Sequence, residues 1–193
     1  ESAGSNNDYS IARTEDGGET WAIEDLPEEF GFPRFQRASN RIFIPMNRRF
    51  WFSDDRDETW TERSTPVNSI EVFYFATPEI GFAVGETTAF RTTDGGQNWE
   101  LILELDEHTG ATDLIMDPRD PDVLYAAALQ RRRHVFTYVG GGPGSGIYKT
   151  TDGGQNWSKA NKGLPSGDIG RIGLAISPAN PEYLYAMVEA AGN

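Results

Sequence analysis

The chain has 193 residues, a formal net charge of −13 and no cysteine. The missing cysteine excludes disulfides, thiol catalysis and cysteine-ligated metals, and the acidic surface disfavours nucleic acid and anionic lipid as partners. No apolar run approaches the roughly 20 residues of a membrane-spanning helix, and no signal peptide is recognisable, so we expect neither nucleic-acid binding nor membrane insertion.

One motif recurs four times along the chain. The octapeptide at residues 92–99 is repeated identically at 150–157, and looser copies occupy 14–21 and 53–60. The last residue of each copy is tryptophan, and successive tryptophans are 39, 39 and 58 residues apart. A repeat of about 40 residues is the size of one four-stranded propeller blade. The sequence therefore predicts an all-β fold, a β-propeller of four-stranded antiparallel blades with about four blades' worth of chain.

The four copies share the pattern Ser/Thr-x-Asp-x-Gly-x-x-Trp, in which the second copy lacks the glycine. Asp-Gly followed by glycine is typical of a hairpin turn, because glycine adopts positive φ without strain. The aspartate can accept hydrogen bonds from N–H groups of the turn, and the tryptophan offers a large apolar surface for packing. We therefore expect folding roles, and not catalytic ones, for the motif residues Asp16, Gly18, Trp21, Asp55, Trp60, Asp94, Gly96, Trp99, Asp152, Gly154 and Trp157.

The second copy departs from the pattern, since Asp57 stands where glycine is expected. Either the turn is distorted there, or the carboxylates of Asp54, Asp55, Asp57 and Glu58 hold a structural cation. We favour a solvated acidic turn, and we expect no other cofactor.

Strand-like segments on either side of the motif divide the chain into units at 1–33, 34–66, 67–106, 107–163 and 164–193. In chain order the expected strands are 9–13, 21–25, a strand near Phe35, 41–44, 50–52, 60–62, 70–75, 82–84, 88–90, 100–103, 111–116, 123–128, 146–149, 169–176 and 183–188. Residues 129–145 form an insertion in the fourth unit, and the glycine-rich run 140–146 is expected to be a return loop because it lacks the Lys-Ser/Thr of a phosphate-binding loop.

The first and last units each contain half a blade. Residues 1–33 supply the third and fourth strands, and residues 164–193 supply the first and second. The two halves can combine into one blade and close a ring of four, or the chain can be part of a larger or dimeric propeller. We favour the second arrangement because a four-bladed ring is sterically tight, and we then expect self-assembly, or contact with more blades, through the half-blades.

The four motif copies resemble the Asp-box, also called the bacterial neuraminidase repeat. In that family the box joins the third and fourth strands of a blade, away from the catalytic face. Four further segments are similar to bacterial sortilin-like propeller proteins, often labelled glycosyl-hydrolase-like: 109–128, 130–134, 140–148 and 163–178. Residues 1–108 resemble a broader group that includes photosystem II stability-factor-like propellers. These resemblances imply a secreted or cell-envelope protein of bacterial type that binds ligands or proteins.

The basic run Arg131, Arg132, Arg133 and His134 is the clearest local departure from the acidic composition. Long loops on a rigid scaffold often carry function, and guanidinium groups suit a carboxylate, a phosphate or an acidic partner surface. The same groups can instead pair with nearby acids and fix the loop across blades, which is the interpretation we favour. Tyr138 can stack on a sugar or pack inward, and these five residues are the candidate binding residues. His108, beside two acids, is expected to be a turn residue.

For function, we expect a non-catalytic secreted module that contacts a protein, peptide or glycan through blade loops. One alternative is a glycoside hydrolase of the sialidase or xyloglucanase type. That chemistry needs two carboxylates facing a sugar, and the 30 acids single out no pair, while consecutive arginines on a strand point apart and make a poor carboxylate clamp. A further alternative is a structural component of a larger secreted assembly.

Overall fold

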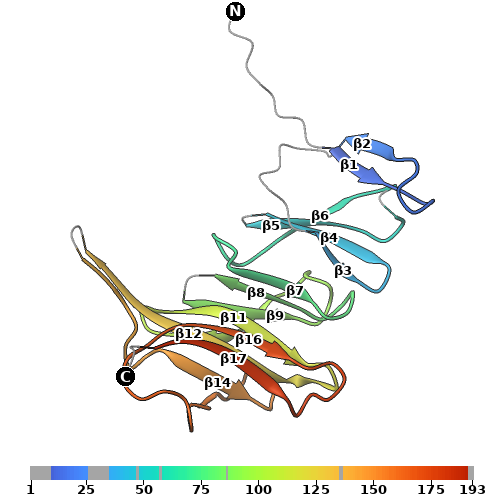
Figure 1. The fold of residues 1–193 in the computed structure, drawn as a ribbon. Coiled ribbons are helices and arrows are strands. Elements are labelled where there is room, and N and C mark those ends of the chain that lie inside the picture. The colour runs from blue at the N-terminus through green and yellow to red at the C-terminus, as the bar shows by residue number, and fades with distance from the viewer. Residues whose placement is uncertain are drawn as a thin grey trace, which may run out of the picture. The chain divides into compact units, whose positions relative to one another are not determined.

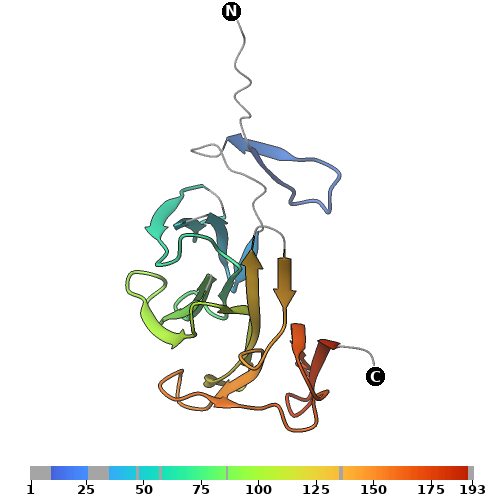
Figure 2. The same cartoon turned by 90° about the vertical axis from the view of Figure 1, so that its left-hand side faces the viewer.

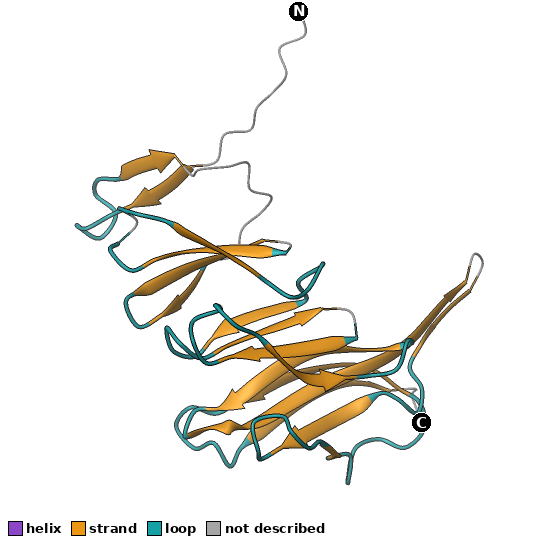
Figure 3. Cartoon of the chain, turned by 180° about the vertical axis from the view of Figure 1, so that it is seen from behind, coloured by secondary structure: helices purple, strands orange, loops and turns teal. Residues whose placement is uncertain are grey.

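The computed structural model describes residues 10–25, 35–46, 48–56, 58–85, 87–134 and 137–190, without the side chains of 24–25 and 132–139. Every regular element in these ranges is a β-strand (Figure 3), which confirms the all-β prediction. Within the same ranges no helix is long and apolar enough to cross a membrane. The chain forms two compact units, residues 1–34 and 35–193, and each is described by itself.

In the first unit, β1 (Ser10–Arg13) and β2 (Ala22–Asp25) form a two-stranded antiparallel sheet. Ser10 lies opposite Asp25 and Arg13 lies opposite Ala22, with the first motif copy as the turn between the strands. Trp21, at the end of that turn, is 57% exposed.

The second unit contains three complete sheets and one two-stranded sheet (Figure 1). The first sheet has β3 (Gln36–Ala38), β4 (Arg41–Met46), β5 (Arg49–Ser53) and β6 (Thr61–Ser64). The next has β7 (Val72–Phe75), β8 (Gly81–Gly85), β9 (Thr88–Thr92) and β10 (Glu100–Glu104). The third has β11 (Thr109–Asp117), β12 (Asp120–His134), β14 (Gly146–Thr150) and β15 (Ser158–Lys159). The last has β16 (Ile169–Ile176) and β17 (Leu184–Ala190).

In each complete sheet the four strands pair in chain order, with β13 lying off the path of the third sheet, so each sheet is an antiparallel meander of the kind that forms a propeller blade. The insertion differs from the loop that the sequence suggested. The strand β12 continues to His134, and its last four residues pair with β13 (Thr137–Gly140), a two-stranded arm that Figure 2 shows beyond the sheet. The β13 side of the pair carries threonine, tyrosine and valine, which are residue types common in strands.

Three buried apolar clusters join consecutive sheets. The cluster between the first two complete sheets is aromatic, and those that follow are mainly aliphatic. Their buried members include, in turn, Phe43, Phe50, Phe52 and Phe75; Phe82, Val84, Ile102, Leu103, Leu114 and Leu124; and Ala127, Ile147, Ile169 and Ile172. The two middle sheets, β7–β10 and β11–β15, therefore bury one face against the sheet before and the other against the sheet after, which is how stacked repeats are stabilised.

The motif aspartates hold their turns by hydrogen bonds. Asp94 accepts the hydroxyl of Thr92 at 2.8 Å, and it accepts the backbone N–H and side-chain amide of Asn98 at 2.9 and 2.7 Å. The Gly96 N–H donates to the Thr92 hydroxyl at 2.8 Å. The same bonds recur at Asp152, with Thr150 and Asn156 as partners.

These hydrogen bonds stabilise the ionised carboxylates, so the pKa of the motif aspartates is low. The bonds from Asn98 lower the pKa of Asp94 from 3.8 to about 2. The Thr150 hydroxyl, followed by Asn156, lowers the pKa of Asp152 to about 2, and Thr59 does the same for Asp55. Thr20 and Thr14 lower the pKa of Asp16 well below its ordinary value.

We expect the folded state to lose stability as these carboxylates become protonated. A group whose folded pKa is depressed contributes fully above its unfolded pKa, and the contribution is lost as pH falls towards the folded pKa. The window for Asp94 is therefore from about pH 4 down to about pH 2. Wild type should melt higher than Asp94→Asn at pH 6, and thermal scans should show this gap closing by pH 2. A gap that stays constant over this range would contradict the prediction.

The tryptophans of the third and fourth motif copies pack on the preceding sheet. The Trp99 ring meets Phe50 and Phe75 edge-on, with centroids 6.3 and 6.1 Å away, and its Nε1 donates to the carbonyl of Ser64 at 3.2 Å. Trp157 repeats the arrangement one sheet later, where its Nε1 donates to the carbonyl of Ile102 at 2.6 Å. In these two copies the indole therefore links the turn to the sheet before it.

Arginines of the preceding sheet also donate hydrogen bonds to these motif turns. Arg63 of β6 donates from Nη1 to the carbonyl of Gly95 at 2.5 Å, in the motif turn of the next sheet. Arg91 of β9 donates to the carbonyl of Gly153 at 3.4 Å and forms an ion pair with Asp122 at 2.9 Å. The third and fourth turns are thus each linked to the preceding sheet by their own indole and by a guanidinium of that sheet.

Candidate functional site

A cleft of about 660 Å³ lies where β7, β11, β16 and β17 come together, and we call it the inner-strand cleft. It is within the size range of ligand sites in proteins. The residues that line it come from four segments far apart in the sequence: Glu71, Val72, Thr112, Asp113, Arg171, Ile172, Gly173, Met187, Val188 and Glu189. Strands β7, β11 and β16 are each the first strand of a sheet, so the fold gathers these residues by repeating one position from blade to blade.

Asp113 ties two sheets together at the cleft. One of its carboxylate oxygens accepts the N–H of Leu114 at 2.9 Å, and the other accepts the N–H of Leu174 on β16 at 2.8 Å. Because both oxygens already accept backbone hydrogen bonds, this carboxylate fixes the distance between β11 and β16.

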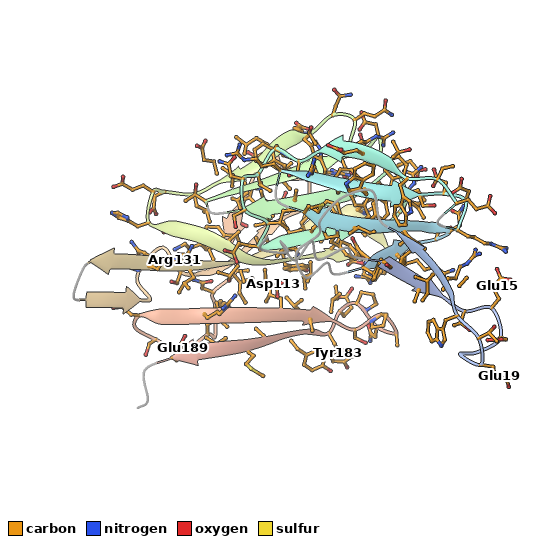
Figure 4. All side chains as sticks on the ribbon, turned by 90° about the horizontal axis from the view of Figure 1, so that it is seen from above. Glu15, Glu19, Asp113, Arg131, Tyr183 and Glu189 are labelled. Atoms are coloured by element: carbon orange, nitrogen blue, oxygen red, sulfur yellow. The ribbon has the colours of Figure 1, made fainter. Side chains whose placement is uncertain are left out.

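Glu189 forms a similar contact at the rim. Its Oε2 accepts the backbone N–H of Arg171 at 3.1 Å, which links β17 to the start of β16. Figure 4 shows Asp113 and Glu189 on the two sheets that border the cleft. The floor is apolar, since Ile172 is buried and Val72 and Val188 are partly buried. The remaining charged groups at the rim are Glu71 and the exposed Arg171.

Gly173 leaves open space in the cleft wall. A side chain at this position would meet no atom within 4 Å. Met187, opposite Gly173 on β17, is 83% exposed. Tyr185 on the same strand and Tyr183 just before it are 62% and 60% exposed. Exposed apolar side chains in a row beside a cleft are typical of interaction surfaces.

The basic run lies on the arm formed by β12 and β13, and not in a loop. The Cα register places Arg131 opposite Gly140, Arg132 opposite Val139, Arg133 opposite Tyr138 and His134 opposite Thr137. Arg131 is exposed at the base of the arm (Figure 4), and the side chains of Arg132, Arg133, His134 and Tyr138 lie outside the described part. The structure therefore gives the backbone position of the basic run, which lies on the β12 side of the arm.

Two carboxylates of the acidic second turn, those of Asp54 and Asp55, accept hydrogen bonds. Arg41 donates from Nε and Nη2 to Asp54 at 2.6 and 2.8 Å. Asp55 accepts the N–H of Thr59 at 2.9 Å, as the other motif aspartates do. Arg56 stands at the first glycine position with φ of 61°, and Asp57 lies outside the described residues.

No set of three or more metal-type ligands gathers in the part of the chain that the structure describes. His108 sits in the turn between β10 and β11, where its N–H donates to Asp106 at 2.9 Å. Its Nε2 lies 3.2 Å from a carboxylate oxygen of Glu107.

Comparison with known proteins agrees with the repeat and the fold. The BNR/Asp-box repeat model matches residues 90–101 and 148–159, which are the third and fourth motif copies. Comparison with curated protein sequences gave no match.

Solved propeller structures share the fold. The GH74 xyloglucanase from Xanthomonas campestris superposes with a TM-score of 0.63 and 19% identity, over 96% of this chain and 31% of that one. YCF48 from Cyanidioschyzon merolae superposes with a TM-score of 0.58 and 16% identity, over 86% of this chain and 55% of that one. An ancestral GH74 enzyme superposes with a TM-score of 0.55 and 14% identity, over 80% of this chain and 23% of that one. The chain thus spans between about a quarter and about half of these structures.

The chain is therefore an all-β protein of the β-propeller type. It carries BNR/Asp-box repeats, as the sequence predicted. The likeness to sortilin-like proteins stays a prediction.

Sequence reasoning missed the inner-strand cleft. Its charged residues, Glu71, Asp113, Arg171 and Glu189, belong to no local motif. The available signal was the repeat itself: aligning the first strands of successive units would have placed residues near 71, 113 and 172 side by side. Glu189 would not have been found in this way, because it lies on a second strand.

Proposed function

We propose that the chain is a non-catalytic binding module, secreted or held at the cell envelope, that takes a protein, peptide or glycan in the inner-strand cleft. The supporting observation is that the carboxylates of the cleft accept hydrogen bonds from the backbone. Asp113 uses both oxygens on backbone N–H groups, and Glu189 uses one on Arg171. Their geometry suits a preformed wall that holds its shape around a ligand.

A hydrolase requires a different arrangement. General acid–base catalysis needs a carboxyl group that exchanges a proton with the substrate, and a glycosidase needs a second carboxylate facing the same sugar. Asp113 accepts one backbone N–H on each carboxylate oxygen, an arrangement that supports a positioning role. Likeness in fold to the GH74 enzymes does not carry their activity, because function depends on the site and not on the fold.

The arm is the second part of this proposal. Residues 123–151 contain no aspartate or glutamate, and include three consecutive arginines in a chain of net charge −13. We propose that Arg131, Arg132, Arg133, His134 and Tyr138 contact an acidic area of a partner that also reaches the cleft. A two-stranded arm holds these residues at lower entropic cost than a free loop would.

Filling the cleft should weaken binding without unfolding the chain. In Gly173→Trp the new indole would occupy the open space beside Met187. Basic, neutral and acidic synthetic peptides and xyloglucan oligosaccharides serve as probes, and release of reducing ends from xyloglucan tests hydrolysis. Lys162→Trp adds the same side chain at an exposed position outside the cleft and is the control.

We expect at least one probe to bind wild type and Lys162→Trp equally, and to bind Gly173→Trp at least about tenfold more weakly. Equal binding by all three proteins would rule out the cleft as the site. Reducing ends released by wild type, and lost in Gly173→Trp, would establish the hydrolase alternative instead.

A further inference from the structure

We propose that Gln130 is a positioning residue for the arm. With the glycine-rich loop 141–145, which we call the clasp, it sets the direction in which the basic run meets an acidic partner. This inference rests on the proposed function, in which the arm contacts an acidic area of a partner. Three observations carry it: the place of Gln130 in the strand, its hydrogen bonds to the clasp, and the close packing of the clasp.

Gln130 lies where β12 leaves the third sheet and enters the arm. On one edge, β12 pairs with β14 as far as Ala128 and with β13 from Arg131 onward, so the clasp replaces a paired strand beside Gln130. On the other edge, Gln130 is opposite Thr109 at the start of β11. Beyond Gln130, β13 is the only described strand that pairs with β12. The direction of the arm relative to the sheet is therefore set at this residue.

Gln130 holds the clasp through three of its polar groups. Its backbone N–H donates to Oγ of Ser145 at 2.9 Å, and its carbonyl accepts the N–H of Gly141 at 2.8 Å. Its side-chain Oε1 accepts the N–H of Gly144 at 2.9 Å. Ser145 is buried, and its own N–H donates to the carbonyl of Gly142 at 3.0 Å. Because buried polar groups need hydrogen-bond partners, this set of bonds favours one path for the loop.

The clasp also has little room to move. A Cβ at Gly142 would overlap Oε1 of Gln130, and a Cβ at Gly144 would overlap Oγ1 of Thr109 on β11. Gly142 forms a β-bridge with Ile169, the first residue of β16. The clasp is thus in contact with its own sheet and with the first strand of the next one. A change in the direction of the arm at its base would break these contacts.

A set direction matters because of what the arm carries. Residues 123–151 include the basic run and no aspartate or glutamate, and Figure 2 shows the arm extending beyond the sheet. An arm that moved freely would have to be ordered when a partner bound, and that ordering would cost conformational entropy. Gln130 therefore supports binding through the arm, without itself touching the partner.

Two substitutions separate the amide from the shape of this side chain. Gln130→Met keeps a similar length but removes the oxygen that accepts the Gly144 N–H, whereas Gln130→Glu keeps an oxygen acceptor there. Gln155→Met makes the first change at an exposed glutamine in the fourth motif turn and is the control. Urea unfolding checks that each variant is folded.

Two readouts are needed. The first is the distance distribution, from pulsed electron paramagnetic resonance, between spin labels on Thr137→Cys in the arm and Ser158→Cys on β15. The chain has no cysteine of its own, so only these two positions are labelled. The second readout is fluorescence anisotropy of a fluorescein-labelled peptide of seven glutamates, which serves as the acidic partner.

We expect wild type and Gln155→Met to give the same narrow distance distribution and to bind the glutamate peptide equally. Gln130→Met should broaden the distribution and weaken peptide binding at least about tenfold. Gln130→Glu should keep the distribution narrow, although its added charge repels the peptide. If Gln130→Met does not fold, Ser145→Ala takes its place with the same expected results, because it removes the hydroxyl that accepts the Gln130 N–H.

A narrow distribution in Gln130→Met, with the peptide still bound as in wild type, would overturn the inference and leave the proposed role of the arm standing. A broadened distribution with unchanged binding would also overturn it, because the direction of the arm would then not matter to the partner. If the peptide does not bind wild type, the proposed role of the arm fails, and this inference fails with it.

Discussion

Replacing Phe50 by alanine should destabilise the second unit by about 3–5 kcal/mol, the range for a fully buried phenylalanine. Phe50 is completely buried. Its ring lies within 5.1–6.3 Å, centroid to centroid, of Phe43, Phe52, Phe73, Phe75 and Trp99. The substitution leaves a cavity between two consecutive sheets, and it removes the surface on which the motif turn of the later sheet rests.

Urea denaturation followed by tryptophan fluorescence measures this loss. The control is Phe35→Ala, the same chemical change at a side chain that is 55% exposed, which should cost less than about 1 kcal/mol. If both variants lost similar stability, Phe50 would not be at a sheet-to-sheet interface.

Gly96→Ala should have the second large effect, for two reasons that add. Gly96 has φ of +88°, a conformation that costs a residue with a side chain about 1–2 kcal/mol. A Cβ built at Gly96 would also overlap Cζ of Phe50, and overpacking of this kind costs about 1–3 kcal/mol. The expected loss of unfolding free energy is therefore about 2–5 kcal/mol.

Gly163→Ala separates the two contributions. Gly163 has φ of +92°, and a Cβ there would meet no atom within 4 Å, so only the backbone cost applies. We expect Gly163→Ala to lose about 1–2 kcal/mol, which is less than Gly96→Ala loses. Equal losses, measured by the same urea titrations, would mean that Phe50 does not press on the motif turn.

The repeat made the fold predictable. Four copies of one turn, spaced by about one blade, defined hairpins between strands, and the expected strand at 169–176 coincides with β16. Sequence could also place the tryptophans at the ends of the turns. It could not say which sheet they pack on, because that depends on how blades stack and not on any local pattern.

The arm and the cleft were harder to foresee. Residues 129–140 contain glycine and a run of arginines, so they look like an exposed insertion, and pairing between β12 and β13 extends a strand across that composition. The cleft assembles Glu71, Asp113 and Glu189 from three sheet strands or their ends. Single acids in separate units give no signal in a chain with 30 of them. Only the stacking of sheets brings these residues together.

The central claim is that the third and fourth motif turns rest on the sheet before them, and the double variant Phe50→Ala/Gly96→Ala tests it at the third turn. Once the Phe50 ring is gone, a methyl group at position 96 has room, so Gly96→Ala should cost at least about 1 kcal/mol less in the Phe50→Ala background than in wild type. Gly154→Ala, at the next interface against Ile102, should cost the same in both backgrounds. If the losses at positions 50 and 96 simply added, the two sheets would not meet there.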